Sequence, residues 1–170
     1  SVTCFGGSDG MISLSVSGGN SNYTYIWSNN QTTQNATNLV AGTYSVYVYD
    51  STNCQGIFTY NVYESFSPLS ASAIVTEVSC FGFSDGMLTI VPTGGSSPYS
   101  YSWNNGQNSQ SLTNLSIGTY TCTVTDNLGC ITYATATVGQ PQQLVLTSSS
   151  VSTSCFGYSD GSAGVIPQGG

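Results

Sequence analysis

The six cysteines are the residues whose spacing constrains their chemistry most. Cys4 and Cys54 are 54 − 4 = 50 residues apart, and Cys80 and Cys130 are also 130 − 80 = 50 residues apart. Equal spacing in two stretches predicts one disulfide in each, Cys4–Cys54 and Cys80–Cys130, with Cys155 left to pair outside the sequence. A zinc site is disfavoured, because the intervals are long and the sequence contains no Cys-x-x-Cys and no histidine.

The second chemical feature is a set of recurring aspartates. Without Lys, Arg or His the sequence lacks the usual catalytic base and oxyanion clamp, so we expect no enzyme activity. Asp9 and Asp50 recur as Asp85 and Asp126, and a residue present in every copy is more often structural than catalytic. If the predicted disulfides bring each pair of loops together, these four carboxylates are candidate calcium ligands. The alternative is that Asp9 precedes Gly10 in a tight turn and that Asp50 accepts backbone N–H bonds at a strand end. No other cofactor is expected.

Charge limits the classes of partner. The net charge is −7 with no cationic side chain, which disfavours nucleic acid and anionic membrane surfaces. Apolar residues make up 39 % and aromatic residues 12 %, so the composition is not that of a disordered chain. No apolar run approaches the roughly 20 residues that span a bilayer, and we expect no membrane insertion.

A seven-residue motif divides the chain into repeats. Cys-Phe-Gly-x-Ser-Asp-Gly begins at Cys4, Cys80 and Cys155, at intervals of 80 − 4 = 76 and 155 − 80 = 75 residues. A period of this size predicts a tandem array of modules. Because Pro68 and Pro141 suit linkers, we expect three segments: residues 1–66, a first repeat lacking its opening strand; 67–141, a complete repeat; and 142–170, a partial third repeat.

Within each repeat the residue pattern is that of short strands. Tyr99, Tyr101 and Trp103 alternate with serines, and the Asn104-Asn105-Gly106 segment that follows is a hairpin signal. No segment shows the 3.6-residue period of a helix. The sequence therefore predicts an all-β protein built of antiparallel sandwiches. Besides six clear strands per repeat, we expect a seventh, either because the segment Gln107 to Leu115 is split in two or because the opening strand switches sheets.

The repeated residues also resemble a known family. The motifs Cys80-Phe81-Gly82, Ser84-Asp85-Gly86, Gly94-Gly95, Pro98 to Trp103, Gly118-Thr119-Tyr120 and Gly129-Cys130 closely resemble the SprB repeat. That repeat occurs in very large surface adhesins of gliding Bacteroidetes and in related secreted proteins. The resemblance covers essentially the whole sequence. It implies tandem Ig-like or PKD-like sandwiches forming an extended rod or fibre, export by type IX secretion, and a filament used in adhesion and gliding.

Three further positions have expected roles. The family has a hydrophobic residue in place of Cys122, so we expect Cys122 to be a buried free thiol. Asp50-Ser51-Thr52 resembles the Bacteroidetes O-glycosylation sequon, which makes Ser51 a candidate for modification. Tyr47 and Tyr49 are expected on the outer face, either to bind sugars or surfaces or to stabilise the sheet by cross-strand pairing.

Taken together, these patterns predict a structural and adhesive cell-surface fibre segment, anchored to the outer membrane by resemblance. Expected partners are extracellular surfaces or glycans, other repeats of the same chain, and the secretion and gliding machinery. The alternative is a calcium- or glycan-binding module, or a spacer, in a secreted multidomain lectin or enzyme.

Overall fold

A computed structural model describes residues 1–64 and 67–170. These residues form strands, turns and loops, and none of them is helical, which confirms the all-β prediction. The first repeat contains β1 (Gly10–Ile12), β2 (Thr24–Trp27), β3 (Ala36–Leu39), β4 (Gly42–Tyr49) and β5 (Gln55–Val62). The second contains β6 (Ser70–Thr76), β7 (Gly86–Thr93), β8 (Ser100–Trp103), β9 (Ser111–Leu115), β10 (Gly118–Thr125) and β11 (Ile131–Val138), and the third β12 (Val145–Val151) and β13 (Ser162–Gln168).

Contacts divide the described residues into two compact units. The first comprises residues 1–70, 92–100 and 124–132, and the second comprises 71–91, 101–123 and 133–170. The predicted repeat boundaries follow the sequence period and stay a prediction, and the last two residues of the first predicted repeat, 65 and 66, lie outside the described residues. No helix of the described chain is long and apolar enough to cross a membrane.

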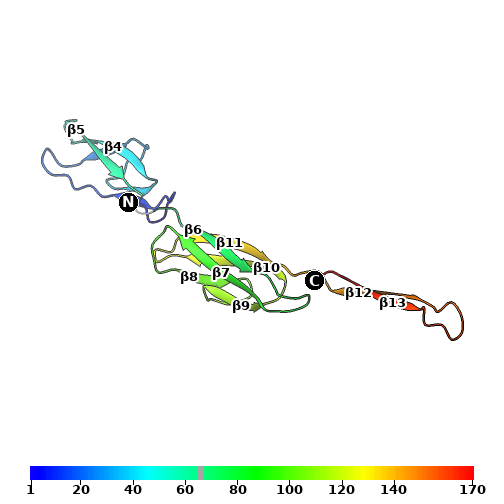
Figure 1. Ribbon diagram of the computed structural model, residues 1–170. Coiled ribbons are helices and arrows are strands. Elements are labelled where there is room, and N and C mark those ends of the chain that lie inside the picture. Colours follow the sequence, from blue (N-terminus) through cyan, green and yellow to red (C-terminus); the bar gives the residue numbers. More distant parts are fainter. Residues whose placement is uncertain (65–66) are drawn as a thin grey trace. The chain divides into compact units, whose positions relative to one another are not determined.

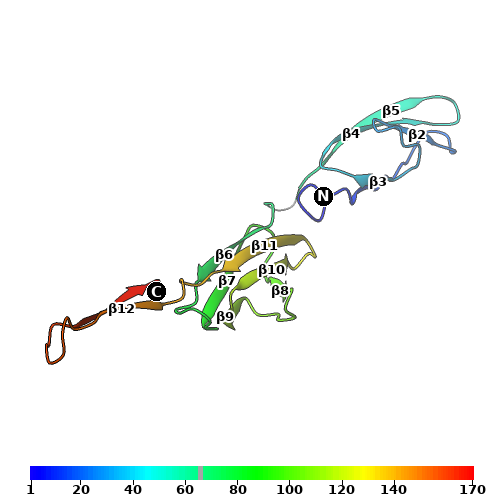
Figure 2. The same cartoon turned by 90° about the vertical axis from the view of Figure 1, so that its right-hand side faces the viewer.

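Each of the first two repeats contains two small sheets. In the first repeat β2, β4 and β5 form one antiparallel sheet, and Figure 1 labels its strands β4 and β5. Trp27 lies opposite Val46, and Val46 opposite Phe58. Its other sheet pairs only β1 with β3. The second repeat has the sheets β8-β10-β11 and β6-β7-β9, and the third has the hairpin β12-β13 (Figure 2). Among its described residues, the first repeat therefore has no counterpart of β6.

Buried positions recur at a constant offset of 76 residues. The core of the first repeat has nine buried members: Val2, Ile12, Leu14, Trp27, Ala36, Leu39, Val46, Val48 and Val62. Adding 76 to each gives Val78, Leu88, Ile90, Trp103, Leu112, Leu115, Cys122, Val124 and Val138, and each of these is buried as well. Burial of apolar side chains is the main stabilising term in folding. Each of the two repeats is therefore stabilised by an equivalent core of its own.

Aromatic side chains fix the loops of both repeats with matching hydrogen bonds. The indole Nε1 of Trp27 donates to the carbonyl of Thr33, and that of Trp103 to the carbonyl of Ser109, each at 2.8 Å. The Tyr44 hydroxyl donates to the Val40 carbonyl four residues upstream at 3.0 Å. Its counterpart, the Tyr120 hydroxyl, donates to the Ser116 carbonyl at 3.1 Å. This bond resembles the tyrosine corner of immunoglobulin-type sandwiches.

The segment between Gln107 and Leu115 forms one strand, β9, so the seventh strand expected there is not present among the described residues. The residues before β9 wrap the Trp103 ring instead. Trp103 donates its backbone N–H to the Gln107 carbonyl at 2.9 Å and its indole N–H to Ser109. The segment before β9 is thus occupied by hydrogen bonds to Trp103, and β9 begins at Ser111.

Candidate functional site

One disulfide is present among the described residues, and it joins Cys4 to Cys130. The two Cα atoms are 5.6 Å apart and the two cysteines are 126 residues apart in sequence. Cys54, Cys80 and Cys155 are exposed free thiols. The predicted pairs Cys4–Cys54 and Cys80–Cys130 are therefore wrong, because the bond in the structure joins a cysteine of the first repeat to one of the second.

The physical reason is that the cysteines of one repeat flank a long strand. Cys54 directly precedes β5, whereas Cys4 lies near its far end, where Val2 donates its N–H to the Tyr63 carbonyl at 3.0 Å. An eight-residue strand spans about 26 Å, and a disulfide needs Cα atoms about 4.4–6.8 Å apart. Equal spacing in sequence shows that two positions are equivalent, but it does not show that they pair with each other.

The second repeat has the same arrangement around β11. Cys130 directly precedes this strand. Near the other end, Val78 donates its N–H to the Gly139 carbonyl at 3.2 Å, and Cys80 follows two residues later. Gly82 also donates to the Gln140 side chain at 2.9 Å, as Gly6 donates to Glu64 at 3.0 Å in the first repeat. Cys80 and Cys130 are thus at opposite ends of their repeat.

A buried aspartate holds the turn that presents Cys130. The Asp126 Oδ1 accepts backbone N–H bonds from Leu128 at 2.9 Å and Cys130 at 2.8 Å, while its Oδ2 accepts one from Ser96 at 2.9 Å. Burial opposes ionisation of this side chain, but these N–H donors outweigh it, and the pKa of Asp126 is lowered overall. The carboxylate therefore fixes the backbone of the disulfide cysteine.

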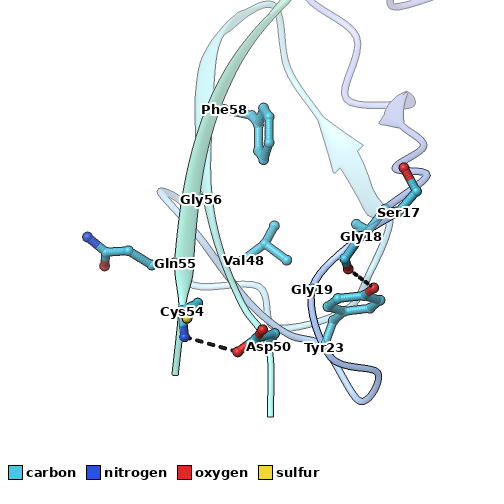
Figure 3. A pocket seen from close by; sticks show the side chains of 11 residues that line it. Ser17, Gly18, Gly19, Tyr23, Val48, Asp50, Cys54, Gln55, Gly56 and Phe58 are labelled. Carbon is cyan, nitrogen blue, oxygen red and sulfur yellow. Dashed lines mark hydrogen bonds between the residues drawn. The ribbon is translucent and has the colours of Figure 1, made fainter. Parts of the chain in front are cut away.

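Asp50 builds the same turn in the first repeat. Its Oδ2 accepts the N–H of Asn20 at 3.1 Å, and its Oδ1 accepts the N–H of Thr52 at 2.8 Å and of Cys54 at 3.0 Å. These bonds, with the Asn20 donor first and the Thr52 side chain second, lower the pKa of Asp50 to about 2. Figure 3 shows the carboxylate bonded to the backbone of Cys54, whose thiol is free.

The aspartate of the seven-residue motif has a different partner. Asp9, Asp85 and Asp160 each accept the N–H of the residue six positions earlier: Thr3 at 2.9 Å, Ser79 at 3.0 Å and Ser154 at 3.0 Å. Hydrogen bonds from the side chains and backbones of these same residues lower the pKa of all three carboxyls. The motif is thus a turn closed by its own aspartate.

These positions separate the carboxylates proposed as calcium ligands. Asp9 belongs to the turn next to Cys4 and Asp50 to the turn next to Cys54, at opposite ends of β5. Asp85 and Asp126 occupy the equivalent places around β11. The disulfides that were expected to bring each pair together are not formed. Among the described residues no group of three or more His, Cys, Asp or Glu side chains is arranged to hold a metal ion.

A pocket of about 210 Å³ opens beside Asp50 (Figure 3). Val48, Phe58 and Tyr23 line it, together with the Gly18-Gly19 pair. In the second repeat Pro68 and Leu69 fill the corresponding place: a Cβ on Gly94 would lie 2.1 Å from the Pro68 carbonyl oxygen, whereas one on Gly18 would meet nothing within 4 Å. The pocket is therefore an uncovered end of the first core.

The remaining candidate residues differ in exposure. Ser51 is exposed in the turn between β4 and β5, directly after Asp50. Tyr47 is 41 % exposed and lies opposite Ile57, whereas Tyr49 is half-buried opposite Gln55. Cys122 is buried without a disulfide, as expected, and burial raises the pKa of its thiol. Glycosylation of Ser51 and sugar binding by the tyrosines stay predictions.

Comparison with known proteins finds a family match for two segments of the chain. The family model of the SprB repeat matches residues 1–32 and 72–108. These segments contain the first two copies of the seven-residue motif, so the resemblance to the SprB repeat is confirmed for both. No curated protein matches the chain.

Several solved structures with immunoglobulin domains are similar to the chain. An amphioxus IgVJ-C2 molecule is 18 % identical with a TM-score of 0.35, over 79 % of this chain and 97 % of that one. A structure concerned with Dscam isoform specificity is 18 % identical with a TM-score of 0.37, over 69 % and 38 %. The N-terminal eight Ig domains of DSCAM isoform 1.30.30 are 16 % identical with a TM-score of 0.36, over 84 % and 24 %. At such TM-scores these likenesses say nothing about what the chain does.

Proposed function

We propose that this chain is a structural segment of a cell-surface adhesin, in which β-sandwich repeats are joined covalently and carry tension. The observation that supports this most directly is the Cys4–Cys130 disulfide, which connects two SprB repeats. The peptide backbone already links the repeats, so an added bond is of most use where the chain is pulled. Formation of the bond also requires an oxidising compartment, which is consistent with an extracellular location.

The disulfide changes the path that a pulling force takes. A force on the two chain ends passes from Cys4 through the two sulfurs to Cys130, and the enclosed residues bear none of it. A separation of 126 residues corresponds to about 430 Å of fully extended chain that cannot be pulled out while the bond is intact. The segment would therefore keep its length under load, as a tether needs to do.

Single-molecule stretching from the two ends tests this proposal. The oxidised chain is expected to show no extension from residues 5–129, whereas the reduced chain should release up to about 430 Å as both cores unfold. Cys4→Ser under oxidising conditions is the matched control and should behave like the reduced protein. Release of the full length from the oxidised wild type would contradict a tension-bearing role.

Adhesion itself is proposed to be multivalent and weak at each repeat. The repeats carry no cation, and their exposed surface is rich in hydroxyl and amide side chains, so each contact is expected to be small and to add through effective concentration. Beads coated at increasing density should adhere to glass or polystyrene with a steep dependence on density. Saturable binding of the monomer to one sugar on a glycan array would support the alternative, a glycan-binding module.

Three finer parts of the proposal come from the family resemblance: export by type IX secretion, anchoring at the outer membrane and a role in gliding. Partners on this reading are extracellular surfaces or glycans, neighbouring repeats and the secretion and gliding machinery. Deleting the gene and scoring surface display and gliding of the cells tests this part separately. Normal gliding without the protein would leave the stretching result untouched and remove only the motility role.

A further inference from the structure

Cys80 lies in surroundings that closely match those of the disulfide-bonded Cys4. Cys4 and Phe5 line a pocket of about 300 Å³ with Pro68 and Leu69. Cys80 and Phe81 line one of about 380 Å³ with Gln143 and Leu144. Cys80 lies 80 − 4 = 76 positions after Cys4, and Leu144 lies 144 − 69 = 75 positions after Leu69. These are the two repeat intervals, so the two pockets are lined by equivalent positions.

The backbone next to the two pockets also matches. Gly95 donates its N–H to the Ser67 carbonyl at 3.0 Å, and Gly170 donates to the Gln142 carbonyl at 3.1 Å. A Cβ on Gly94 would lie 2.1 Å from the Pro68 carbonyl oxygen, and one on Gly169 would lie 2.2 Å from that of Gln143. The start of the third repeat, at Gln142 and Gln143, therefore makes the same backbone contacts as the start of the second repeat, at Ser67 and Pro68.

The two surroundings differ in one wall. The pocket at Cys4 is completed by Gly129, Cys130 and Ile131. The pocket at Cys80 has no such turn among its lining residues, and Cys80 is exposed. The missing wall is a turn that carries a cysteine.

Such a turn is present elsewhere in the chain. Cys54 is the counterpart of Cys130, since 130 − 54 = 76, and Gln55 stands where Ile131 follows Cys130. Asp50 holds Cys54 by the same backbone bond, at 3.0 Å, that Asp126 makes to Cys130. Cys54 is also exposed and free. The chain thus contains one completed disulfide and, at equivalent positions, an unpaired motif cysteine and an unpaired turn cysteine.

We propose that Cys80 and Cys54 are the two halves of disulfides to further copies of this repeat. Cys80 bonds to the turn cysteine of a following copy, the counterpart of Cys130, and Cys54 bonds to the motif cysteine of a preceding copy, the counterpart of Cys4. Every disulfide of the array then joins one repeat to the next, and none closes a single repeat. This inference does not depend on the adhesive function.

The bond forms by thiol–disulfide exchange with a low-molecular-weight disulfide such as oxidised glutathione. The Cys80 thiolate attacks one sulfur of the oxidant, which releases one glutathione thiolate and leaves a mixed disulfide. The thiolate of the partner cysteine then attacks the Cys80 sulfur and displaces the second glutathione thiolate. Two protein thiols are oxidised, one glutathione disulfide is reduced to two glutathiones, and each protein thiol gives up its proton.

The test uses the full chain lengthened by one in-register copy of residues 67–141, inserted after Pro141. The protein is refolded with oxidised and reduced glutathione and digested with pepsin, because the sequence has no trypsin site and acid stops thiol exchange. Mass spectrometry is expected to find Cys4 linked to Cys130 and, in addition, Cys80 linked to Cys130 of the inserted copy, with Cys54 free. The unlengthened chain should contain only the first link.

Two variants make the result decisive. Cys130→Ser in the inserted copy alone should abolish the Cys80 link and leave the Cys4 link, which shows in the same molecules that the protein has folded. Cys4→Ser in the unlengthened chain should give no intramolecular disulfide, because Cys80 and the freed Cys130 flank β11. A lengthened chain without any Cys80–Cys130 linked peptide, or a Cys80–Cys130 bond in either variant, would overturn the proposal.

Discussion

The Asp126 carboxylate and the Cys130 backbone are joined by a hydrogen bond of 2.8 Å, and Cys130 is in turn bonded to Cys4. A buried anion thus sets the position of a disulfide sulfur. The turn is closed further by the Asp126 N–H, which donates to the Cys130 carbonyl at 3.0 Å. Because Asp126 accepts three backbone N–H groups in part-buried hydrogen bonds, its loss would leave these donors without this acceptor.

Asp126→Ala is therefore expected to lower the free energy of unfolding by about 2 kcal/mol, since each unsatisfied buried donor costs about 1–3 kcal/mol. It should also slow formation of the Cys4–Cys130 bond during oxidative refolding. Asp126→Asn keeps an acceptor oxygen and should recover much of both losses. Urea unfolding and time-resolved thiol trapping measure the two effects, and equal behaviour of the Ala and Asn variants would exclude a hydrogen-bonding role.

Acid should destabilise the protein in a narrow range of pH. The folded-state pKa values of Asp9, Asp50, Asp85 and Asp126 are lowered from 3.8, that of Asp50 to about 2. A lowered folded pKa contributes stability that is present above the unfolded pKa and is lost as the pH falls through the folded pKa. The Tm is therefore expected to fall between about pH 4 and about pH 2.

Between about pH 5 and about pH 8 the Tm should stay nearly constant, because the sequence has no histidine to titrate there. Thermal melts followed by circular dichroism across this range measure both parts of the profile. Asp50→Asn is the matched control and should flatten the acid limb, since it removes the group whose pKa is lowered to about 2. A Tm that is constant down to pH 2 would contradict the role assigned to these carboxylates.

Cys122 offers a test of core packing with a built-in reference, because Val46 occupies the same position in the first repeat. Cys122→Val is expected to change the free energy of unfolding by less than about 1.5 kcal/mol, as is usual for apolar substitutions of similar volume. Cys122→Ser places a hydroxyl in an apolar site and should cost about 1–3 kcal/mol. Urea titrations of the two variants separate these outcomes, and a serine variant as stable as the valine variant would show that the site admits water.

Much of the fold follows from local patterns in the sequence. Period-two alternation around Trp103 predicts a strand, because it depends only on residues close in the chain. The constant offset between repeats predicts which positions of the two cores are equivalent. The burial of Cys122 follows from its alignment with Val46. The pairing of Cys4 does not follow, because it depends on which end of β5 each cysteine occupies, and that is set by the direction of the strand.

The role of the aspartates was left between two alternatives by the sequence alone. Asp50 is near Cys54 in sequence, which gave no indication that its Oδ2 bonds to Asn20, 30 residues away. Asp9 was considered together with Asp50 only because a disulfide was expected between Cys4 and Cys54. Once the disulfide is placed correctly, the two carboxylates separate, and hydrogen bonding within turns accounts for each.

This separation leads to a prediction for calcium. The Asp50 Oδ1 already accepts the N–H groups of Thr52 and Cys54 and the Thr52 hydroxyl, at 2.7 to 3.0 Å, so its lone pairs are directed at protein donors. A calcium ion needs six to eight oxygen ligands, and Asp9 is too distant to add its own. The Tm should therefore be the same in EDTA and in excess calcium. A calcium-dependent rise in Tm that Asp50→Asn abolishes would show that the turn opens to bind the ion.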